Sequence, residues 1–333
     1  MSSADQAREP AWAGLEPVAT QVRQVGDAWA KRIQISLGHP GRLLTRAETK
    51  TRPAPYYHFL PHDGTRPLFL KVVNTAALET QLAGNRIANW LAAQALPVSP
   101  ILESYPRRLH ADYQLLAYRR IDSRFATASE NDLRAIGQLL ASVHNGLRAL
   151  PWGDDIRQAS RERDHLFLRL QQQVKKQLLP EVAERQVETR LPDTDAQVIH
   201  ADLNIGNLLF GRLSHQATLL DFEDATHNFH SPQVDLAMAL ERFVMVRTSD
   251  DSLALQLGQA FLQGYRERIR RLPTLSAQPA SILQTLATRS QLLLANSPTS
   301  TSVAGEQQKF VYLHDLAAHK ATLLDRLWDT LAG

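Results

Sequence analysis

The sequence predicts an α+β fold with two lobes, a small β-rich N-terminal lobe and a larger, mainly helical C-terminal lobe. Two observations predict this fold class. Short segments rich in β-branched and aromatic residues are concentrated between residues 32 and 73. After residue 122, long segments with the apolar period of amphipathic helices dominate. We therefore expect a flexible N-terminus at 1–14, an N-lobe at 15–121 and a C-lobe at 122–333.

Four short segments of the N-lobe have the composition of strands: RIQISL, RLLTRAE, PYYHFL and PLFLKVV. The sequence HDGT, at 62–65, separates the last two, and an Asp-Gly pair between such segments predicts a hairpin. A helix is expected over 75–94, where the prolines of LPVSP end it. YQLLAYRRI, at 113–121, predicts one more strand.

The C-lobe is expected to contain helices at 131–147, 161–179, 234–246, 252–271, 281–295 and 307–331. In the first of these, Leu133, Ile136 and Leu140 fall on one face. Two short apolar strands, 197–200 and 217–222, are spaced like a hairpin around NLLFGRLSHQ. Chemically useful side chains are concentrated at this predicted hairpin.

The composition is that of an ordinary globular protein: of 333 residues, 44% are hydrophobic and 21% are charged, with a formal net charge of +3 and no cysteine. The lack of cysteine excludes disulfides, thiolate metal sites and cysteine nucleophiles. No apolar run is long enough to span a membrane, and the first residues have no signal-peptide pattern. The charge excess is too small to predict nucleic-acid binding. We expect a cytoplasmic protein that binds neither membranes nor nucleic acids.

The segment VIHADLNIGNLLF contains His200, Asp202 and Asn207 in the spacing H-x-D-x-x-x-x-N, and Asp221 follows in LLDFEDA. This pattern resembles the catalytic segment of the aminoglycoside phosphotransferase and choline kinase group, in which H-G-D-x-x-x-x-N precedes an apolar strand with I-D-F or I-D-W. AIGQLLASVHNG, ALPVSPIL and the Asp235-Leu236-Ala237 sequence are similar to further segments of that group. The resemblance covers about residues 67–245 and implies the two-lobed, protein-kinase-like fold.

The resemblance implies an ATP- and Mg²⁺-dependent kinase that transfers the γ-phosphoryl group to a hydroxyl of a small molecule. Such a reaction needs an aspartate to orient the hydroxyl and accept its proton, and an amide oxygen and a second carboxylate to hold the metal. By position, Asp202 is the base, and Asn207 and Asp221 are the metal ligands. His200 is expected to be a packed, hydrogen-bonded histidine, and Asp235 is implied to brace the catalytic loop.

In the N-lobe, Lys71 is where the family places the lysine that contacts the nucleotide phosphates. Glu79 is the only acidic residue of the following helix, yet aligning the end of the helix puts Gly84 where the family has its glutamate, so a Lys71–Glu79 pair and a surface carboxylate both stay open. No G-x-G-x-x-G is present. Of the two candidate phosphate loops, LGHPG and TKTRPAP, we prefer the second, with the hydroxyls of Thr49 and Thr51 facing phosphate.

Two other functions are considered. A catalytically inactive, pseudokinase-type module would bind nucleotide without transferring phosphate. A non-haem iron oxygenase would use His200, Asp202 and a distal histidine, inside a barrel that these short strands do not suggest.

The acceptor is expected to be a small hydroxyl compound. The C-terminal region has no concentration of acidic residues such as a polycationic aminoglycoside would need, and its aromatic residues have the spacing of a helix core rather than of a choline box. A sugar-like acceptor is therefore our leading hypothesis, with amino alcohols and aminoglycosides as alternatives. The pattern does not define an oligomeric state.

Overall fold

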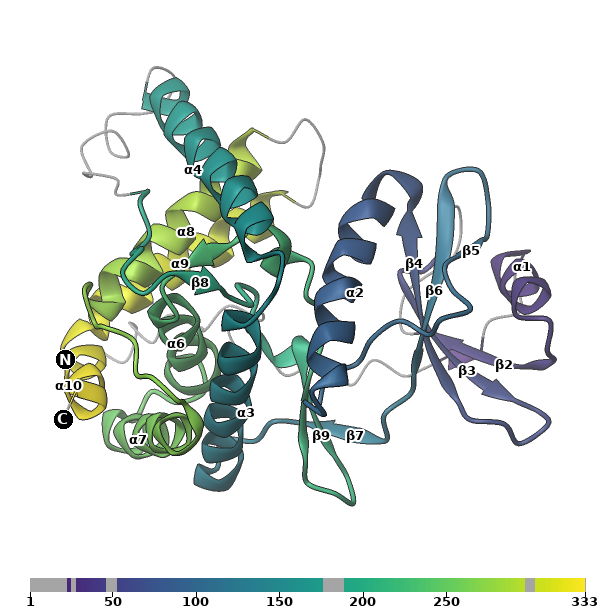
Figure 1. Cartoon of the computed structure of the whole chain (residues 1–333), viewed down its shortest axis with the longest axis horizontal. Helices are drawn as coiled ribbons and strands as arrows, with labels where there is room; N and C mark the ends of the chain where they lie inside the picture. Colours follow the sequence, from purple (N-terminus) through teal and green to yellow (C-terminus); the bar gives the residue numbers. More distant parts are fainter. Residues whose placement is uncertain (1–22, 25–27, 46–52, 176–188, 297–302, 333) are drawn as a thin grey trace, which may run out of the picture. The chain divides into compact units, whose positions relative to one another are not determined.

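The computed structural model describes residues 23–24, 28–45, 53–175, 189–296 and 303–332 of the chain. The chain divides into two compact units (Figure 1). One, here called the sheet unit, contains Pro17–Arg124 and Leu209–Glu223; the other, the helical unit, contains Phe125–Leu208 and Asp224–Gly333. The predicted α+β class is confirmed. In this division Leu209–Glu223 groups with the sheet unit, whereas the sequence placed it in the C-lobe.

The sheet unit is built on six strands in the order β1-β2-β3-β4-β6-β5, all paired antiparallel. Their bounds are Arg23–Gln24 (β1), Gly41–Thr45 (β2), Tyr56–Pro61 (β3), Leu68–Asn74 (β4), Arg107–Arg108 (β5) and Tyr113–Arg119 (β6). The predicted HDGT hairpin joins β3 to β4. There the Asp63 carboxylate accepts hydrogen bonds from the N–H and the hydroxyl of Thr65, and Gly64 has a φ of +75°.

The segment RIQISL is helical, and our prediction of a strand there was wrong. It forms part of α1, Ala28–Leu37. Ile33 and Leu37, four residues apart, are buried, whereas Ile35 between them is 79% exposed. The alternation of three aliphatic residues suggested a strand, but the helical spacing of the two that reach the core decides the structure.

Helix α2, Leu78–Ala93, packs along the sheet (Figure 1). It follows a short turn of 3₁₀ helix, η1, Thr75–Ala77, which the Asn74 side chain caps by accepting the Ala76 N–H. Alternate residues of β4 pack on opposite faces of the sheet. Leu70 joins a cluster that contains α1, and Val73 joins a cluster that contains Leu78 of α2. Lys71, which has the same parity as Val73, therefore lies on the α2 face.

A three-stranded sheet in the order β10-β9-β7 completes this part of the chain. Its strands are Ser123–Phe125 (β7), Leu208–Gly211 (β9) and Ala217–Leu219 (β10). We predicted that strands 197–200 and 217–222 would pair as a hairpin, and this pairing was wrong, because the partner of β10 is β9. The sequence LLFG, which we assigned to the turn, forms β9, because the short connection to β10 closes a hairpin directly. The earlier strand, β8, Gln197–Val198, pairs instead with β11, Phe229–His230.

The helical unit contains the helices that the apolar period predicts. They are α3 (Glu130–Arg148), α4 (Gly153–Lys175), α6 (Gln233–Leu240), α7 (Asp251–Arg268), α8 (Pro279–Ala295), α9 (Val303–His319) and α10 (Ala321–Ala332). Short helical turns lie at Ile205–Asn207 (η2) and Asp224–His227 (η3), and α6 continues as a π-helical turn, Glu241–Met245 (η4). The helix predicted over 307–331 is divided at Lys320 into α9 and α10.

Helices α3 and α7 touch through their main chains. A Cβ atom on Gly137 of α3 would meet the carbonyl oxygen of Phe261, and one on Gly264 of α7 would meet the carbonyl oxygen of Arg134. Each helix therefore has a glycine where the other helix approaches, and neither position has room for a side chain. This contact fixes the spacing of the two helices that carry Tyr265 and His144.

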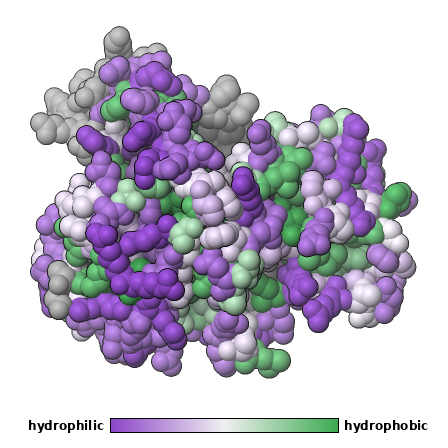
Figure 2. All heavy atoms as spheres, in the orientation of Figure 1, coloured by the Kyte–Doolittle hydropathy of each residue, from purple (hydrophilic) through white to green (hydrophobic). Residues whose placement is uncertain are grey.

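Several large hydrophobic residues of the described part of the chain are exposed, among them Ile35 and Leu213. The face in Figure 2 is mainly hydrophilic, with apolar residues in small separate groups. None of the helices in the described part of the chain is long and apolar enough to cross a membrane.

Candidate active site

The segment from His200 to Asn207 forms a tight loop of the helical unit, directly after β8. Ala201 has a φ of +64°, a left-handed conformation that costs a residue with a Cβ roughly 1–2 kcal/mol. The kinase segments that this loop resembles have glycine at this place, which relieves that strain. Strain of this kind persists only where surrounding contacts hold the backbone in place.

Asp235, in the first turn of α6, supplies those contacts. Its carboxylate is fully buried and accepts the N–H groups of His200 at 2.8 Å and Ala201 at 2.9 Å. It also lies 3.0 Å from Nε2 of His144. Burial by itself would raise the pKa of Asp235, but the hydrogen bonds from the His144 side chain and the Ala201 N–H outweigh burial and lower it.

A chain of buried hydrogen bonds continues behind Asp235. Because Nε2 of His144 must donate to the carboxylate, its Nδ1 accepts the hydroxyl of Tyr265, 2.9 Å away. Burial raises the pKa of Tyr265, so its hydroxyl stays protonated and can donate. The His200–Asn207 loop is thereby connected through α6 to α3 and α7.

Asp202 is held by two asparagine side chains. Its carboxylate accepts Nδ2 of Asn204 at 3.0 Å and Nδ2 of Asn207 at 2.7 Å, and its N–H donates to Nδ1 of His200 at 3.3 Å. Asn207 donates further to the Asp202 carbonyl oxygen at 3.0 Å. With its amide nitrogen committed to Asp202, Asn207 presents its amide oxygen as the atom for a ligand.

Asn204 is a further residue of this loop, and the sequence did not single it out. Besides holding Asp202, its side-chain oxygen accepts the N–H groups of Gly206 and Asn207 and caps η2. An asparagine one residue before a short helical turn is a cap signal that could have been read from the sequence.

Lys71 and Asp221 come together in the sheet unit. Lys71 Nζ lies 3.0 Å from Oδ2 of Asp221 and also pairs with Oε1 of Glu223. Burial alone would lower the pKa of Lys71, but Asp221 and Glu223 raise it. Burial and the adjoining Asp221 raise the pKa of Glu223, and Lys71 opposes that rise. Asp221 has a φ of +58°, a second strained position.

The Lys71–Glu79 pair, which the sequence left open, is not formed. The structure pairs Lys71 with Asp221 and Glu223, and Glu79 lies exposed in the first turn of α2. Glu223 is the second residue that the sequence analysis missed. Thr49 and Thr51, which we predicted to face phosphate, lie outside the described residues.

A row of aromatic rings lies on the same face of the sheet as Lys71. Phe69 stacks on Tyr56 with ring centroids 5.6 Å apart, and its centroid is 5.6 Å from His58 and 6.2 Å from Tyr118. The strand register explains the row, because Phe69 is paired with His58 on one side and Tyr118 on the other. Tyr118 is the last residue but one of β6.

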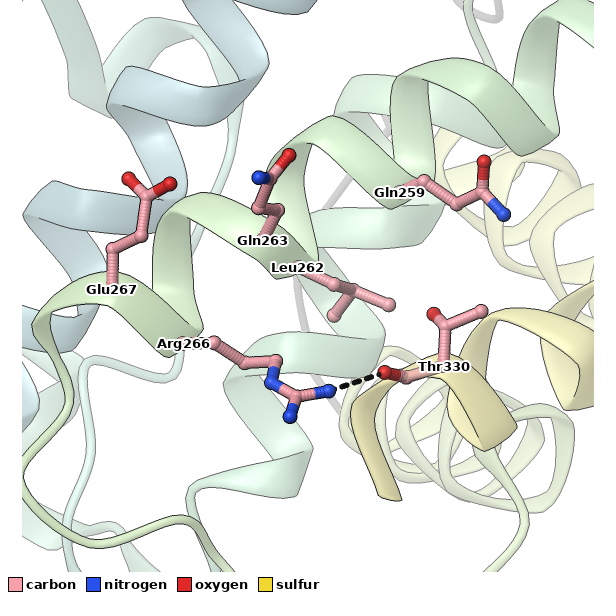
Figure 3. A pocket seen from close by; sticks show the side chains of 6 residues that line it. All are labelled: Gln259, Leu262, Gln263, Arg266, Glu267 and Thr330. Atoms are coloured by element: carbon pink, nitrogen blue, oxygen red, sulfur yellow. Dashed lines mark hydrogen bonds between the residues drawn. The ribbon is translucent and has the colours of Figure 1, made fainter. Parts of the chain in front are cut away.

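A shallow surface hollow of the helical unit, of about 480 Å³, contains none of the predicted site residues. It lies between α7 and the end of α10, where Arg266 donates to the carbonyl oxygen of Thr330 at 2.9 Å (Figure 3). Glu267, at its edge, pairs with Arg134 and Gln138. Its charged groups are therefore committed to partners within the protein.

The buried His230 makes the helical unit sensitive to acid. Burial lowers the pKa of His230 from 6.5 to about 4; Asp164 opposes this effect, and Arg289 and Arg163 add to it. Between these two pKa values the unfolded chain binds a proton that the folded chain does not, so stability falls as the pH drops from 6.5 towards 4. We expect His230 to account for a loss of ~3 kcal/mol over this range.

Thermal unfolding between pH 7 and pH 4 measures this effect. The His230→Gln variant should lose less melting temperature than the wild type over the range, and a variant of the exposed His165 of α4, His165→Gln, should follow the wild type. If the melting temperatures of wild type and His230→Gln fell equally between pH 7 and pH 4, His230 would not be the source of the acid sensitivity.

The fold and the sequence define a class of protein: phosphotransferases of the protein-kinase-like fold. A sequence model of the phosphotransferase enzyme family (APH) matches residues 57–272. The chain belongs to this family. The predicted enzyme class, a phosphotransferase with an alcohol group as acceptor, is thereby confirmed, as is the coarser function of a small-molecule kinase. The iron-oxygenase alternative, which needs a barrel, is excluded by the fold.

Solved structures show the same fold. Amicoumacin kinase hAmiN, in complex with AMP-PNP, Ca²⁺ and Ami, aligns with a TM-score of 0.52 and 14% identity, over 90% of this chain and 89% of that chain. A thermostable mutant of aminoglycoside phosphotransferase APH(4)-Ia, in a ternary complex with AMP-PNP and hygromycin B, aligns with a TM-score of 0.50 and 15% identity, over 94% and 95%. Among curated proteins, no sequence matches the chain significantly.

Proposed function

We propose that the chain is an ATP- and Mg²⁺-dependent kinase that transfers the γ-phosphoryl group to a hydroxyl of a small acceptor. The observation that carries this proposal is the Asp202 carboxylate, which is fixed by Asn204 and Asn207 on a loop braced by the buried Asp235. The nucleotide analogue in the complexes of hAmiN and APH(4)-Ia supports the choice of ATP.

Asp202 acts as the base in this proposal. Hydrogen bonds from two amide groups fix the orientation of its carboxylate, so that an acceptor hydroxyl meets it in one geometry and gives up its proton as the phosphoryl group arrives. The same two hydrogen bonds stabilise the ionised carboxylate, which must be unprotonated to act.

The donor set fits Mg²⁺. Asn207 offers an amide oxygen and Asp221 a carboxylate, and hard oxygen donors of this kind are what the ion takes. When bound, Mg²⁺ supplies positive charge to the transferring phosphoryl group. Lys71 adds a fixed ammonium for the remaining phosphate oxygens. In this assignment the aromatic row beside Lys71 provides π-faces on which a nucleobase can stack.

A sugar-like or other neutral hydroxyl compound remains the leading acceptor, with amino alcohols and aminoglycosides as alternatives. Two of the C-terminal aromatic residues that could contribute to a choline box, Tyr265 and Trp328, are buried. Tyr265 is committed to His144, and Trp328 donates to the carbonyl oxygen of Ala277. These contacts favour a core role for both and weaken the case for a quaternary ammonium acceptor.

The melting temperature with and without ATP and Mg²⁺ tests the nucleotide site. Ligand at 100 times its Kd stabilises the native state by about 2.7 kcal/mol, which for a chain of this size is a rise of roughly 4 °C. We expect this rise in the wild type and in Asp112→Asn, a variant of an exposed residue of the sheet unit, and its loss in Asp221→Asn.

The absence of any shift with ATP or GTP would contradict the proposal. A shift without ADP release across a panel of sugars, amino alcohols and aminoglycosides would favour the inactive, pseudokinase-type module instead.

A further inference from the structure

Lys71 is a buried cation with two carboxylate neighbours from one short segment. Its side chain is 13% exposed, and it pairs with Asp221 and Glu223. We propose that Glu223, two residues after Asp221, is the residue that positions Lys71 for the nucleotide phosphates, in place of a glutamate from α2. This inference rests on the proposed function.

The face of α2 that meets this segment offers no carboxylate. Gln81, Gly84, Asn85 and Ala88 line a small cavity of the sheet unit together with Asp221, Phe222 and Glu223. Asn85 is already engaged, because its side-chain oxygen accepts the Ile101 N–H at 2.6 Å. The one acidic residue of the helix, Glu79, is exposed.

Gly84 of α2 leaves the space in which Glu223, rather than a glutamate from α2, can reach Lys71. A Cβ atom at this position would lie 2.8 Å from the carbonyl carbon of Phe222 and 2.9 Å from the nitrogen of Glu223. The main chain of Phe222–Glu223 therefore occupies the space that a side chain from α2 would need. The glycine that replaces the expected glutamate is thus the residue that lets Glu223 approach.

Glu223, rather than Asp221, is the lasting partner of Lys71. The proposed function assigns Asp221 to the metal, so its carboxylate is shared, whereas Glu223 has no other assigned role. Two carboxylates this close also depend on the ammonium between them. Without the lysine they would repel each other in a partly buried setting where solvent screens charge weakly.

This dependence gives a test that needs no nucleotide. In the wild-type background Glu223→Gln removes one of the two carboxylates that pair with the buried Lys71 ammonium. The melting temperature should therefore fall by about 2–4 °C. In the Lys71→Met background the same substitution removes carboxylate repulsion and should raise the melting temperature. The exposed Glu103→Gln should change neither background by more than about 1 °C.

Nucleotide binding provides the functional measurement. Titration calorimetry with AMP-PNP and no divalent metal should show a Kd that is about 5- to 20-fold weaker for Glu223→Gln than for wild type or Glu103→Gln. Glu223→Asp, which keeps the charge on a shorter side chain, should recover part of the affinity. A purely structural role for Glu223 would lower stability without this charge-dependent recovery.

The outcomes separate the inference from the function on which it rests. Additive effects of Lys71→Met and Glu223→Gln on the melting temperature would overturn the inference even if the wild type binds nucleotide and phosphorylates an acceptor. So would a loss of AMP-PNP affinity in Glu79→Gln but not in Glu223→Gln. In a third outcome, Glu223→Gln lowers the melting temperature in the wild-type background and raises it in the Lys71→Met background, but the wild type binds no nucleotide. This result would support the Lys71–Glu223 pair, yet it would overturn both the kinase function and the role of the pair in it.

Discussion

The Asp202→Asn variant is expected to lose phosphotransfer by roughly 100- to 10 000-fold in kcat, the range that general base catalysis supplies. The amide keeps the size of the side chain but cannot accept the hydroxyl proton, and its nitrogen would face the amide of Asn204 or Asn207. Because Asp202 is partly exposed and is not part of the core, the melting temperature should fall by no more than a few degrees.

The measurement is the single-turnover rate of ADP release with an accepted substrate, alongside calorimetric binding of AMP-PNP. The control is Asp329→Asn, a variant of an exposed aspartate of α10, which should behave as the wild type. The assignment of Asp202 as base would be wrong if Asp202→Asn kept more than about a tenth of the wild-type rate, since the loss would then be smaller than a base accounts for.

The second large effect is on stability, at Asp235. Asp235→Asn replaces an acceptor of three hydrogen bonds with a group that can accept through only one atom, and the N–H of either His200 or Ala201 loses its partner. Breaking a buried charged network in this way costs about 3–5 kcal/mol. A decrease of the melting temperature of roughly 4–7 °C is expected, together with loss of activity.

The pH dependence of this difference provides a second check. Since the folded pKa of Asp235 lies below 3.8, its contribution is present above that value and is lost as the pH falls below it. The gap between wild type and Asp235→Asn should therefore be constant at neutral pH and narrow in acid. A stability difference between wild type and Asp235→Asn that widened in acid would contradict the bracing role of Asp235. So would a melting temperature of Asp235→Asn less than about 2 °C below that of the wild type at pH 7.

The short motifs of the chain could be predicted because their information is local. Asp202 and Asn207 are separated by a single loop, so their spacing already indicates that they meet, and Asp221 follows an apolar strand that fixes its place. The partner of Lys71 could not be found in this way. It depends on the approach of the Phe222–Glu223 backbone to Gly84, a contact between segments more than a hundred residues apart in the chain.

The errors in the fold have a similar cause. In RIQISL the alternation of Ile33, Ile35 and Leu37 satisfies a strand and a helix nearly equally, and only packing against the sheet selects the helix. The strand β8 is two residues long, and its partner β11 is equally short. Neither has a pattern long enough to indicate which other segment it pairs with.

The glycine contact between α3 and α7 has a consequence for engineering the enzyme. The series of hydrogen bonds from Tyr265 through His144 to Asp235 begins one residue after Gly264. The position of the loop that Asp235 holds is therefore set by the contact between two main chains and not by the size of a side chain. A library that varies the exposed side chains of α7 can therefore alter the surface without moving the loop. Gly137 and Gly264 are the two positions that such a library should leave constant.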